Sequence, residues 1–479
     1  MVIDPFQGLA RGHLVDGRWL TEGAARESTN PATDEVLGTF IDGGLNVARA
    51  AVDAAVRAFT KGRWRTDREL RASVLWDLAD AVEANLDRLA TAITLENGKL
   101  LAQARFELSI AAPKLRYYAG LALTDLGTAT ATRSGGISML LKEPIGVAGI
   151  IVPWNSPVIL AIRSLAPALA AGCTTVVKMP AQTALTGILL AEVLSAVPSL
   201  PPGVLNVFTE SGDEGARELV SSPGVHVISY TGSSAVGSKI MSAAAAYLKP
   251  VSLELGGKTP MVVFADADLD AVVPALTAGA TTFAGQFCMT GSRVLVQHQV
   301  ADEIRERLTK SLSALEPGPG MDPETGLGPL IDHASVERID GIVQSSHDAE
   351  MILRGGPTEG PGSFYRPAVL GVQDVGSPLV QQELFGPVVT FEVFATEEEA
   401  VTRANATDYG LAASVWTTDG ARSLRVSTAL DVGTVWTNDW AQIFDQFEEG
   451  GYKRSGLGRL NGPGGLAEFQ EVKHIYRAV

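Results

Sequence analysis

The stretch FAGQFCMTGSR, residues 283–293, contains the best candidate for covalent chemistry. Cys288 is one of two cysteines in the chain, and small and polar residues surround it in place of an apolar run. The glycines allow the backbone to approach a ligand closely, and Arg293 supplies positive charge nearby, which favours a thiolate. A lone cysteine is more often an inert, buried thiol, so other residues must support a nucleophilic role.

Two further stretches could complete a site for nucleophilic catalysis. Glu254 lies inside the apolar run VSLELGG, where a carboxylate has either an ionic partner or the raised pKa that a general base requires. Asn155 lies in the loop VPWNSP between two prolines, and its amide could stabilise a developing oxyanion. A structural ion pair and a rigid turn are the respective alternatives.

A phosphate-binding turn is indicated in VISYTGSSAVGSK, residues 227–239. A strand enters a helix there through Gly232 and Ser233, and helix N-termini attract anions. The pattern is neither a Walker loop nor a G-x-G-x-x-G fingerprint, so a plain strand-to-helix turn is an equal alternative.

Alternating strands and helices must position these residues. From Pro144 the chain repeats short Val/Ile-rich strands and helices, which predicts a parallel, doubly wound sheet that binds nucleotides at the strands' carboxyl ends. A second set begins at PVSLELGGK and leads to Cys288. One helix is expected over 101–123. Residues 126–142, with the turn SGG, predict a hairpin that could pair with another subunit, since its edges need covering.

Composition excludes several classes of protein. The 479 residues are too many for one core, so two domains or more are expected. The net charge is −16 and no basic run could follow a phosphate backbone, which argues against a nucleic-acid partner. No signal peptide, membrane span, disulfide framework or metal-ligand spacing is evident. We therefore expect a cytoplasmic protein without a metal.

Five motifs in order resemble those of the aldehyde dehydrogenase superfamily: PWNSP, LELGGK, GQFC, ELFGPV and GGYKRSG. The resemblance covers nearly the whole chain. It implies an α/β fold with a Rossmann-type cofactor domain (1–124 and 144–255), an α/β catalytic domain (256–457) and a small β oligomerisation element (125–143 and 458–479). It also implies a homodimer or homotetramer.

The resemblance further implies a mechanism. Cys288 would attack an aldehyde to give a thiohemiacetal, with Asn155 and the Cys288 N–H as the oxyanion hole. Hydride transfer to NAD(P) would leave a thioester, and water activated by Glu254 would hydrolyse it to the carboxylic acid. The expected cofactor-binding residues are Val152, Trp154, Lys178, Ala181, Gly232, Ser233, Gly256, Glu383 and Phe385.

Ala181 departs from the family pattern. It replaces the acidic residue that binds the ribose hydroxyls in NAD-preferring members, and this loss of negative charge would also admit the 2′-phosphate of NADP. No new arginine accompanies the change, so NAD remains the expected cofactor.

The expected substrate pocket departs from the family pattern too. Ser156 stands where an aromatic residue is common, and Arg163 would face the same pocket, a combination that resembles members that oxidise aromatic aldehydes such as salicylaldehyde. It is equally consistent with the sequence that Arg163 forms an ion pair with a neighbouring acidic side chain and does not contact the substrate. The pocket residues expected are Ser156, Arg163, Phe287, Met289, Ile443 and Glu449.

An aromatic or bulky apolar aldehyde is the main substrate prediction. A semialdehyde whose distal carboxylate binds Arg163 is the rival, but Glu448 and Glu449, in place of the usual Pro-Phe, would disfavour an anion there. A CoA-acylating enzyme is a further alternative, and Glu254 argues against it because that route needs no water-activating base. A structural relative without activity is the non-enzymatic alternative.

Overall fold

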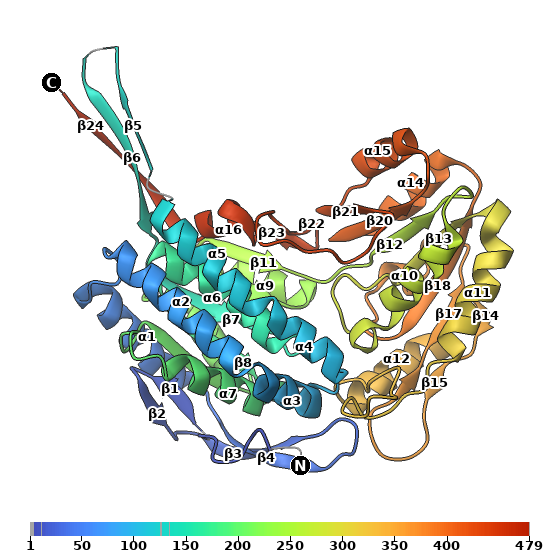
Figure 1. The fold of residues 1–479 in the computed structure, drawn as a ribbon, viewed down its shortest axis with the longest axis horizontal. Coiled ribbons are helices and arrows are strands. Elements are labelled where there is room, and N and C mark those ends of the chain that lie inside the picture. The colour runs from blue at the N-terminus through green and yellow to red at the C-terminus, as the bar shows by residue number, and fades with distance from the viewer. Residues whose placement is uncertain (1–3, 11, 125–126, 134, 479) are drawn as a thin grey trace.

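The computed structural model describes residues 4–10, 12–124, 127–133 and 135–478, and two large sheets organise these residues into two lobes (Figure 1). Within this described part, the first sheet has eight strands and the second has seven. Helices cover both sheets, as expected for an α/β fold, and a three-stranded arm projects from the first lobe (Figure 1).

The first sheet is parallel through its five central strands, with antiparallel strands added at both edges. Its strands in spatial order are β2 (Arg18–Leu20), β1 (His13–Val15), β9 (Leu205–Glu210), β8 (Thr174–Pro180), β7 (Val147–Ile151), β10 (Val227–Thr231), β11 (Val251–Glu254) and β23 (Gly456–Leu457). Alternate residues of β7 face opposite cores, with Ile150 in one and Ile151 in the other, which is why these strands are apolar throughout.

Two helical layers enclose the first sheet. One layer contains α2 (Arg68–Ala84), α3 (Leu86–Asn97), α4 (Leu101–Ser109), α5 (Ala111–Thr124), α6 (Pro157–Ala171) and α7 (Ala184–Ser195). The other contains α1 (Leu45–Lys61), α8 (Glu214–Ser221) and α9 (Ser234–Ala245). The expected single helix over 101–123 is wrong, because α4 and α5 are separate. Pro113 in the first turn of α5 has no N–H to donate back to Ser109, which breaks the helical ladder.

The second sheet is parallel except for its edge strand β14. Its order is β14 (Glu350–Leu353), β17 (Ala368–Gly371), β18 (Val388–Phe394), β13 (Arg293–Gln297), β12 (Pro260–Val263), β20 (Ala412–Trp416) and β21 (Thr434–Thr437). Its helices are α10 (Leu269–Thr281), α11 (Ala301–Ser313), α12 (His333–Ser345), α13 (Pro378–Gln381), α14 (Glu397–Asn405) and α15 (Gly420–Ala429). The short helix α16 (Gly462–Ala467) returns to the first lobe (Figure 1).

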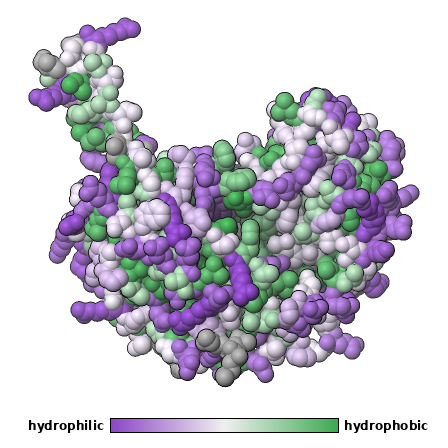
Figure 2. Space-filling view, in the orientation of Figure 1, coloured by the Kyte–Doolittle hydropathy of each residue, from purple (hydrophilic) through white to green (hydrophobic). Residues whose placement is uncertain are grey.

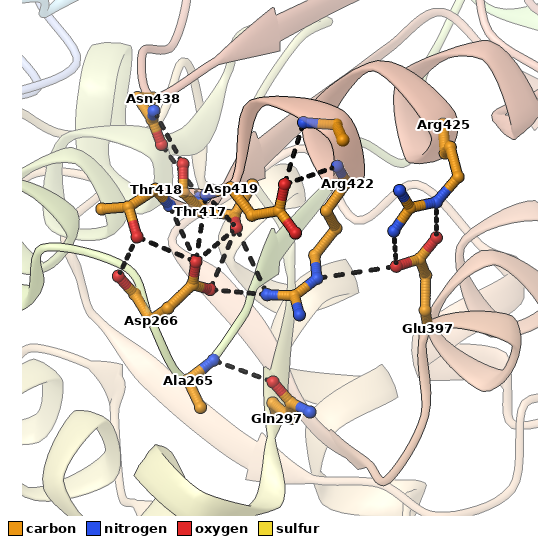
Figure 3. Close-up of polar contacts among 11 residues, drawn as sticks. Ala265, Asp266, Gln297, Glu397, Thr417, Thr418, Asp419, Arg422, Arg425 and Asn438 are labelled. Atoms are coloured by element: carbon orange, nitrogen blue, oxygen red, sulfur yellow. Dashed lines mark hydrogen bonds and ion pairs between the residues drawn. The ribbon is translucent and has the colours of Figure 1, made fainter.

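A polar network closes the second lobe between β12 and α15. Asp266 accepts hydrogen bonds from Thr417 Oγ1 at 2.8 Å, from Thr418 N at 3.0 Å and from Asp419 N at 3.1 Å (Figure 3). Arg422 Nη1 adds a bond of 2.8 Å to the same carboxylate. Asp266 therefore joins the end of one strand to the turn that begins α15.

The arm is an antiparallel sheet of β5 (Thr128–Ala131), β6 (Ile137–Pro144) and β24 (Gln470–Arg477), in the order β24-β6-β5. It stands clear of the body in Figures 1 and 2. The predicted hairpin is present in β5 and β6, although its residues 126 and 134 lie outside the described residues. None of the described helices combines the length and apolar character that crossing a membrane would require.

Candidate active site

Cys288 lies in a turn with an unusual backbone, just after α10. Phe283 and Ala284 have φ values of 53° and 54°, and Gly285 follows with 74°, so three consecutive residues are left-handed. Such conformations cost free energy for residues with side chains and persist where the surroundings enforce them, often at functional sites. A Cβ on Gly285 would lie 2.3 Å from the carbonyl carbon of Gly386, so glycine is required for this close packing.

Asn155 reaches this turn from the first lobe. It lies in the loop between β7 and α6, and its buried Nδ2 donates a hydrogen bond of 3.1 Å to the carbonyl of Gln286. The contact joins positions separated by 131 residues in the chain. An amide nitrogen carries two hydrogens, so a second donor is left for a substrate oxygen close to Cys288.

A buried ion pair that the sequence reasoning missed holds the loop of Asn155. Lys99 Nζ lies 2.7 Å from Glu107 Oε2 and 3.0 Å from Ser156 Oγ, and both charged side chains are only 1% exposed. Glu107 Oε1 also accepts the first backbone N–H groups of α6. The available sequence signal is that Glu107 shares the helix face of the core residues Ala104 and Leu108.

Glu254 ends β11 with a carboxyl group that is buried and poorly compensated. Its Oε1 has no hydrogen-bond partner within the described residues, and the side chain is almost fully enclosed. Burial raises the pKa of Glu254 to about 8, while Arg163 lowers it and Glu449 raises it. A carboxyl group with such a pKa can take a proton near neutral pH, as a general base does.

The Cys288 thiol is not activated by Arg293, contrary to the expectation from the sequence. Arg293 is fully buried and forms a two-bond ion pair with Glu392, at 2.8 Å for each bond, so its charge is compensated. Burial raises the pKa of the Cys288 thiol to about 12, and Arg163 is the cation that lowers it. The acidic groups that raise it further are Glu449, Glu383 and Glu254.

The residues expected in the substrate pocket have specific partners. Arg163 Nη1 lies 2.7 Å from Glu449 Oε1, which corresponds to the alternative of an arginine satisfied by an acid. Ser156 bonds to Lys99. Glu448 turns away and accepts the Gly464 N–H at the start of α16, so the two adjacent glutamates serve different purposes.

Apolar side chains lie beside Cys288. The rings of Phe287 and Trp440 contact each other edge to face, with their centroids 6.0 Å apart. Trp440 Nε1 donates a hydrogen bond of 3.0 Å to the carbonyl of Met289. Met289 is buried, whereas Ile443 is exposed. The immediate surroundings of the thiol on this side are therefore aromatic and apolar.

The residues expected to bind a cofactor lie at the carboxyl ends of the first sheet. Val152 directly follows β7, Lys178 lies in β8, and Ala181 directly follows β8. Ser233 caps α9 by accepting a hydrogen bond from the Val236 N–H. Gly232 donates its N–H to the carbonyl of Glu254. A helix N-terminus at this edge suits a pyrophosphate group.

Glu383 and Phe385 extend from the second lobe towards the same edge. A Cβ on Gly256 would lie 2.1 Å from Glu383 Oε2, so glycine leaves the space that this carboxylate occupies. Burial raises the pKa of Glu383 to about 7, although it accepts the Gly257 N–H. The rings of Trp154 and Phe385 contact each other edge to face, with their centroids 5.5 Å apart. These residues fit a dinucleotide between the lobes.

Comparisons with known proteins match the chain over nearly its whole length. The model of the family described as the aldehyde dehydrogenase family matches residues 19–475. Betaine aldehyde dehydrogenase of Bacillus subtilis (strain 168) is 38% identical over 474 residues, covering 97% of this chain and 96% of that protein. Succinate-semialdehyde dehydrogenase [NADP(+)] of Escherichia coli (strain K12) is 37% identical over 467 residues, covering 96% of each. The structure of betaine aldehyde dehydrogenase from Staphylococcus aureus in complex with NAD+ aligns with a TM-score of 0.96 at 35% identity, covering 99% of this chain and 96% of that one.

Proposed function

The chain belongs to the aldehyde dehydrogenase family, and we propose that Cys288, Asn155 and Glu254 carry out its reaction. It is an oxidoreductase that acts on aldehydes and uses NAD(P). The observation that carries the assignment of residues is the bond from Asn155 Nδ2 to Gln286, because it brings an oxyanion donor next to the only cysteine of the turn.

In the proposed mechanism, the Cys288 thiolate attacks the carbonyl carbon and the carbonyl electrons move to oxygen. Asn155 Nδ2 and the Cys288 N–H donate hydrogen bonds to that oxyanion. As the C=O bond re-forms, the C–H bond of the former aldehyde carbon breaks and its hydride leaves, which a bound nicotinamide would accept, so that a thioester remains on Cys288. Glu254 removes a proton from a water molecule as the oxygen of that water attacks the thioester carbon. Cleavage of the C–S bond then releases the carboxylic acid and restores the thiolate.

The cofactor residues have proposed roles that follow from their chemistry. The N-terminus of α9, with Ser233, would hold the pyrophosphate, and the Lys178 ammonium would bind the adenosine ribose. Glu383 would bind the nicotinamide ribose hydroxyls. Ala181 provides no carboxylate at the adenosine ribose, so we propose that NADP is accepted beside NAD.

We propose a neutral substrate, either an aromatic or a bulky apolar aldehyde. The supporting observation is the bond between Arg163 and Glu449, which occupies the guanidinium that a semialdehyde's distal carboxylate would need. Phe287 and Trp440 offer aromatic surface beside the nucleophile. A semialdehyde remains the second candidate, because several relatives are named succinate-semialdehyde dehydrogenases.

The test is a panel of aldehydes with purified protein, following the absorbance of NADH or NADPH. Benzaldehyde and salicylaldehyde should give higher kcat/KM than succinic semialdehyde or betaine aldehyde. Cys288→Ala should abolish turnover, while Cys173→Ala, a matched change at the other free cysteine, should retain it. A higher kcat/KM for succinic semialdehyde would overturn the substrate proposal. Activity that requires CoA, or no activity in folded protein, would overturn the proposed mechanism.

We also propose that the arm forms a homodimer or homotetramer. Both faces of this thin sheet expose apolar side chains, which a soluble monomer would leave in water. The exposed apolar residues are Ile137, Leu140, Leu141, Val472, Ile475 and Tyr476. Sedimentation of the full chain, compared with a variant in which Leu140 and Val472 become lysine, would show a change from oligomer to monomer.

The two free thiols support a reducing, cytoplasmic location.

A further inference from the structure

A buried ion pair between Arg163 and Glu449 lies at the wall of the active site. Arg163 comes from α6, and Glu449 lies in the segment before β22 (Tyr452–Lys453), which is distant in sequence. The side chains are each 7% exposed, and Nη1 lies 2.7 Å from Oε1. Two segments that lie far apart in the sequence therefore contribute opposite charges to one enclosed place.

Both members of the pair contact the surroundings of Glu254. Arg163 Nη2 donates a hydrogen bond of 3.0 Å to Thr231 Oγ1, and Thr231 is the residue paired with Glu254 in the parallel register of β10 and β11. On the other side, a Cβ on Gly450 would lie 3.0 Å from Glu254 Oε1. Gly450 follows Glu449 directly, so the ion pair lies in the same buried cluster as the carboxyl group of Glu254.

The pair is incompletely hydrogen-bonded, unlike a purely structural ion pair. Arg163 Nε and Glu449 Oε2 have no partner within the described residues, and the same is true of Glu254 Oε1. Burying two charges costs several kcal/mol of desolvation free energy, and apolar residues of similar size commonly serve stability as well or better. Stability alone is therefore a poor reason for charged side chains at these two positions.

We propose that Arg163 is a positioning residue that places a positive charge beside Cys288 and Glu254 and so favours the thiolate and the carboxylate over their protonated forms. Glu449 holds the guanidinium in place and limits the effect. This inference rests on the proposed roles of Cys288 and Glu254. Charges act strongly there because protein encloses the site and water screens them little.

The other charged groups around the site do not supply this effect. Those that act on Cys288 besides Arg163 are acidic, namely Glu449, Glu383 and Glu254, and each disfavours a thiolate. Those that act on Glu254 besides Arg163 are Glu449, Arg459 and Glu468. Arg163 is thus the cation common to both groups, and its own pKa is raised by Glu449, Glu254 and Cys288 although burial opposes this.

The test measures the alkylation rate of Cys288 by iodoacetamide as a function of pH, without aldehyde or cofactor. Peptide mapping assigns the modification to Cys288. Because only the thiolate reacts, the rate at a fixed pH below the thiol pKa reports the thiolate fraction. In Arg163→Met we expect the rate to fall about tenfold, which corresponds to a pKa about one unit higher. In Glu449→Gln the rate should rise.

Two further variants protect the test against misfolding. Arg163→Met leaves Glu449 buried without a partner, so the double variant Arg163→Met/Glu449→Met removes the pair as a unit. The double variant removes the cation together with Glu449, so its rate should exceed that of Arg163→Met and, if Arg163 acts as proposed, stay below that of the wild type. Arg163→Lys keeps the charge and should restore most of the wild-type rate. Arg305→Met breaks an exposed ion pair and should change nothing.

The proposal is overturned if the folded Arg163→Met and double variants alkylate at the wild-type rate, or if Arg163→Lys is as slow as Arg163→Met. If Arg163→Met does not fold, the double variant and Glu449→Gln decide the question by their order relative to the wild type. Alkylation does not require turnover. A wild type without dehydrogenase activity would therefore overturn the proposed function while leaving this test in force.

Discussion

The substitution Glu107→Gln tests how the loop of Asn155 is held. In the wild type, Glu107 Oε2 binds the Lys99 ammonium at 2.7 Å, and Oε1 accepts the N–H groups of Val158 and Ile159 at 3.0 and 3.1 Å. A glutamine oxygen can keep the two backbone bonds, but its NH2 group then faces the ammonium, so donor meets donor. Both side chains are 1% exposed, and water therefore cannot relieve the unpaired charge.

The expected effect follows from burial. Removing one partner of a buried ion pair costs about 3–5 kcal/mol of folding free energy. At about 2–4 °C per kcal/mol for a domain of roughly 150–250 residues, the melting temperature should fall by about 6–20 °C. Lys99 also bonds to Ser156, the neighbour of Asn155. We therefore expect kcat to fall by about tenfold as well, because a displaced amide donor stabilises the oxyanion less.

Scanning calorimetry and steady-state kinetics on the same samples would measure both effects. The matched control is Glu83→Gln, which removes one of the two acidic partners of Arg116 on the exposed face of α2. Exposed ion pairs contribute about 0–1 kcal/mol, so this variant should melt close to the wild type and keep its kcat. If Glu107→Gln melts within about 2 °C of the wild type and retains kcat, the pair does not hold the loop and the reasoning is refuted.

Four further predictions concern the site and the second lobe. Glu254→Gln should give one burst of NAD(P)H per active site and then stop, because the thioester persists. In the wild type, kcat should rise as the pH passes about 8, where the Glu254 carboxyl loses its proton. Asp266→Ala should cost about 2–3 kcal/mol through lost hydrogen bonds, measured by urea unfolding, with KM unchanged. Burial opposes ionisation of Asp266, but hydrogen bonds from Thr417 and Thr418 hold its pKa below the usual value. The difference in unfolding free energy between Asp266→Ala and the wild type should therefore shrink as the pH falls and Asp266 becomes protonated. Ala181→Glu should lower kcat/KM for NADP by about tenfold while sparing NAD, as the ratio of the two initial rates would show.

Much of the architecture could be predicted from local pattern. Val/Ile-rich runs separated by helices predict parallel strands, because a strand buried on both faces must be apolar throughout. The break between α4 and α5 at Ile110 was missed, although Pro113 gives a local reason for it. The motifs around Asn155, Glu254 and Cys288 identify the family, and the comparisons confirm it.

The charges of the site could not be predicted in this way. Arg293 is the basic residue nearest to Cys288 in the sequence, yet Glu392 neutralises it. Arg163 acts on the thiol, and its partner Glu449 lies 286 residues further along the chain. The sequence by itself determined the strands, the helices and the reactive groups, because these depend on side-chain type and on spacings of a few residues. Only the tertiary structure decided which charge faces which group, because that depends on how two lobes, folded from distant segments, exclude water between them.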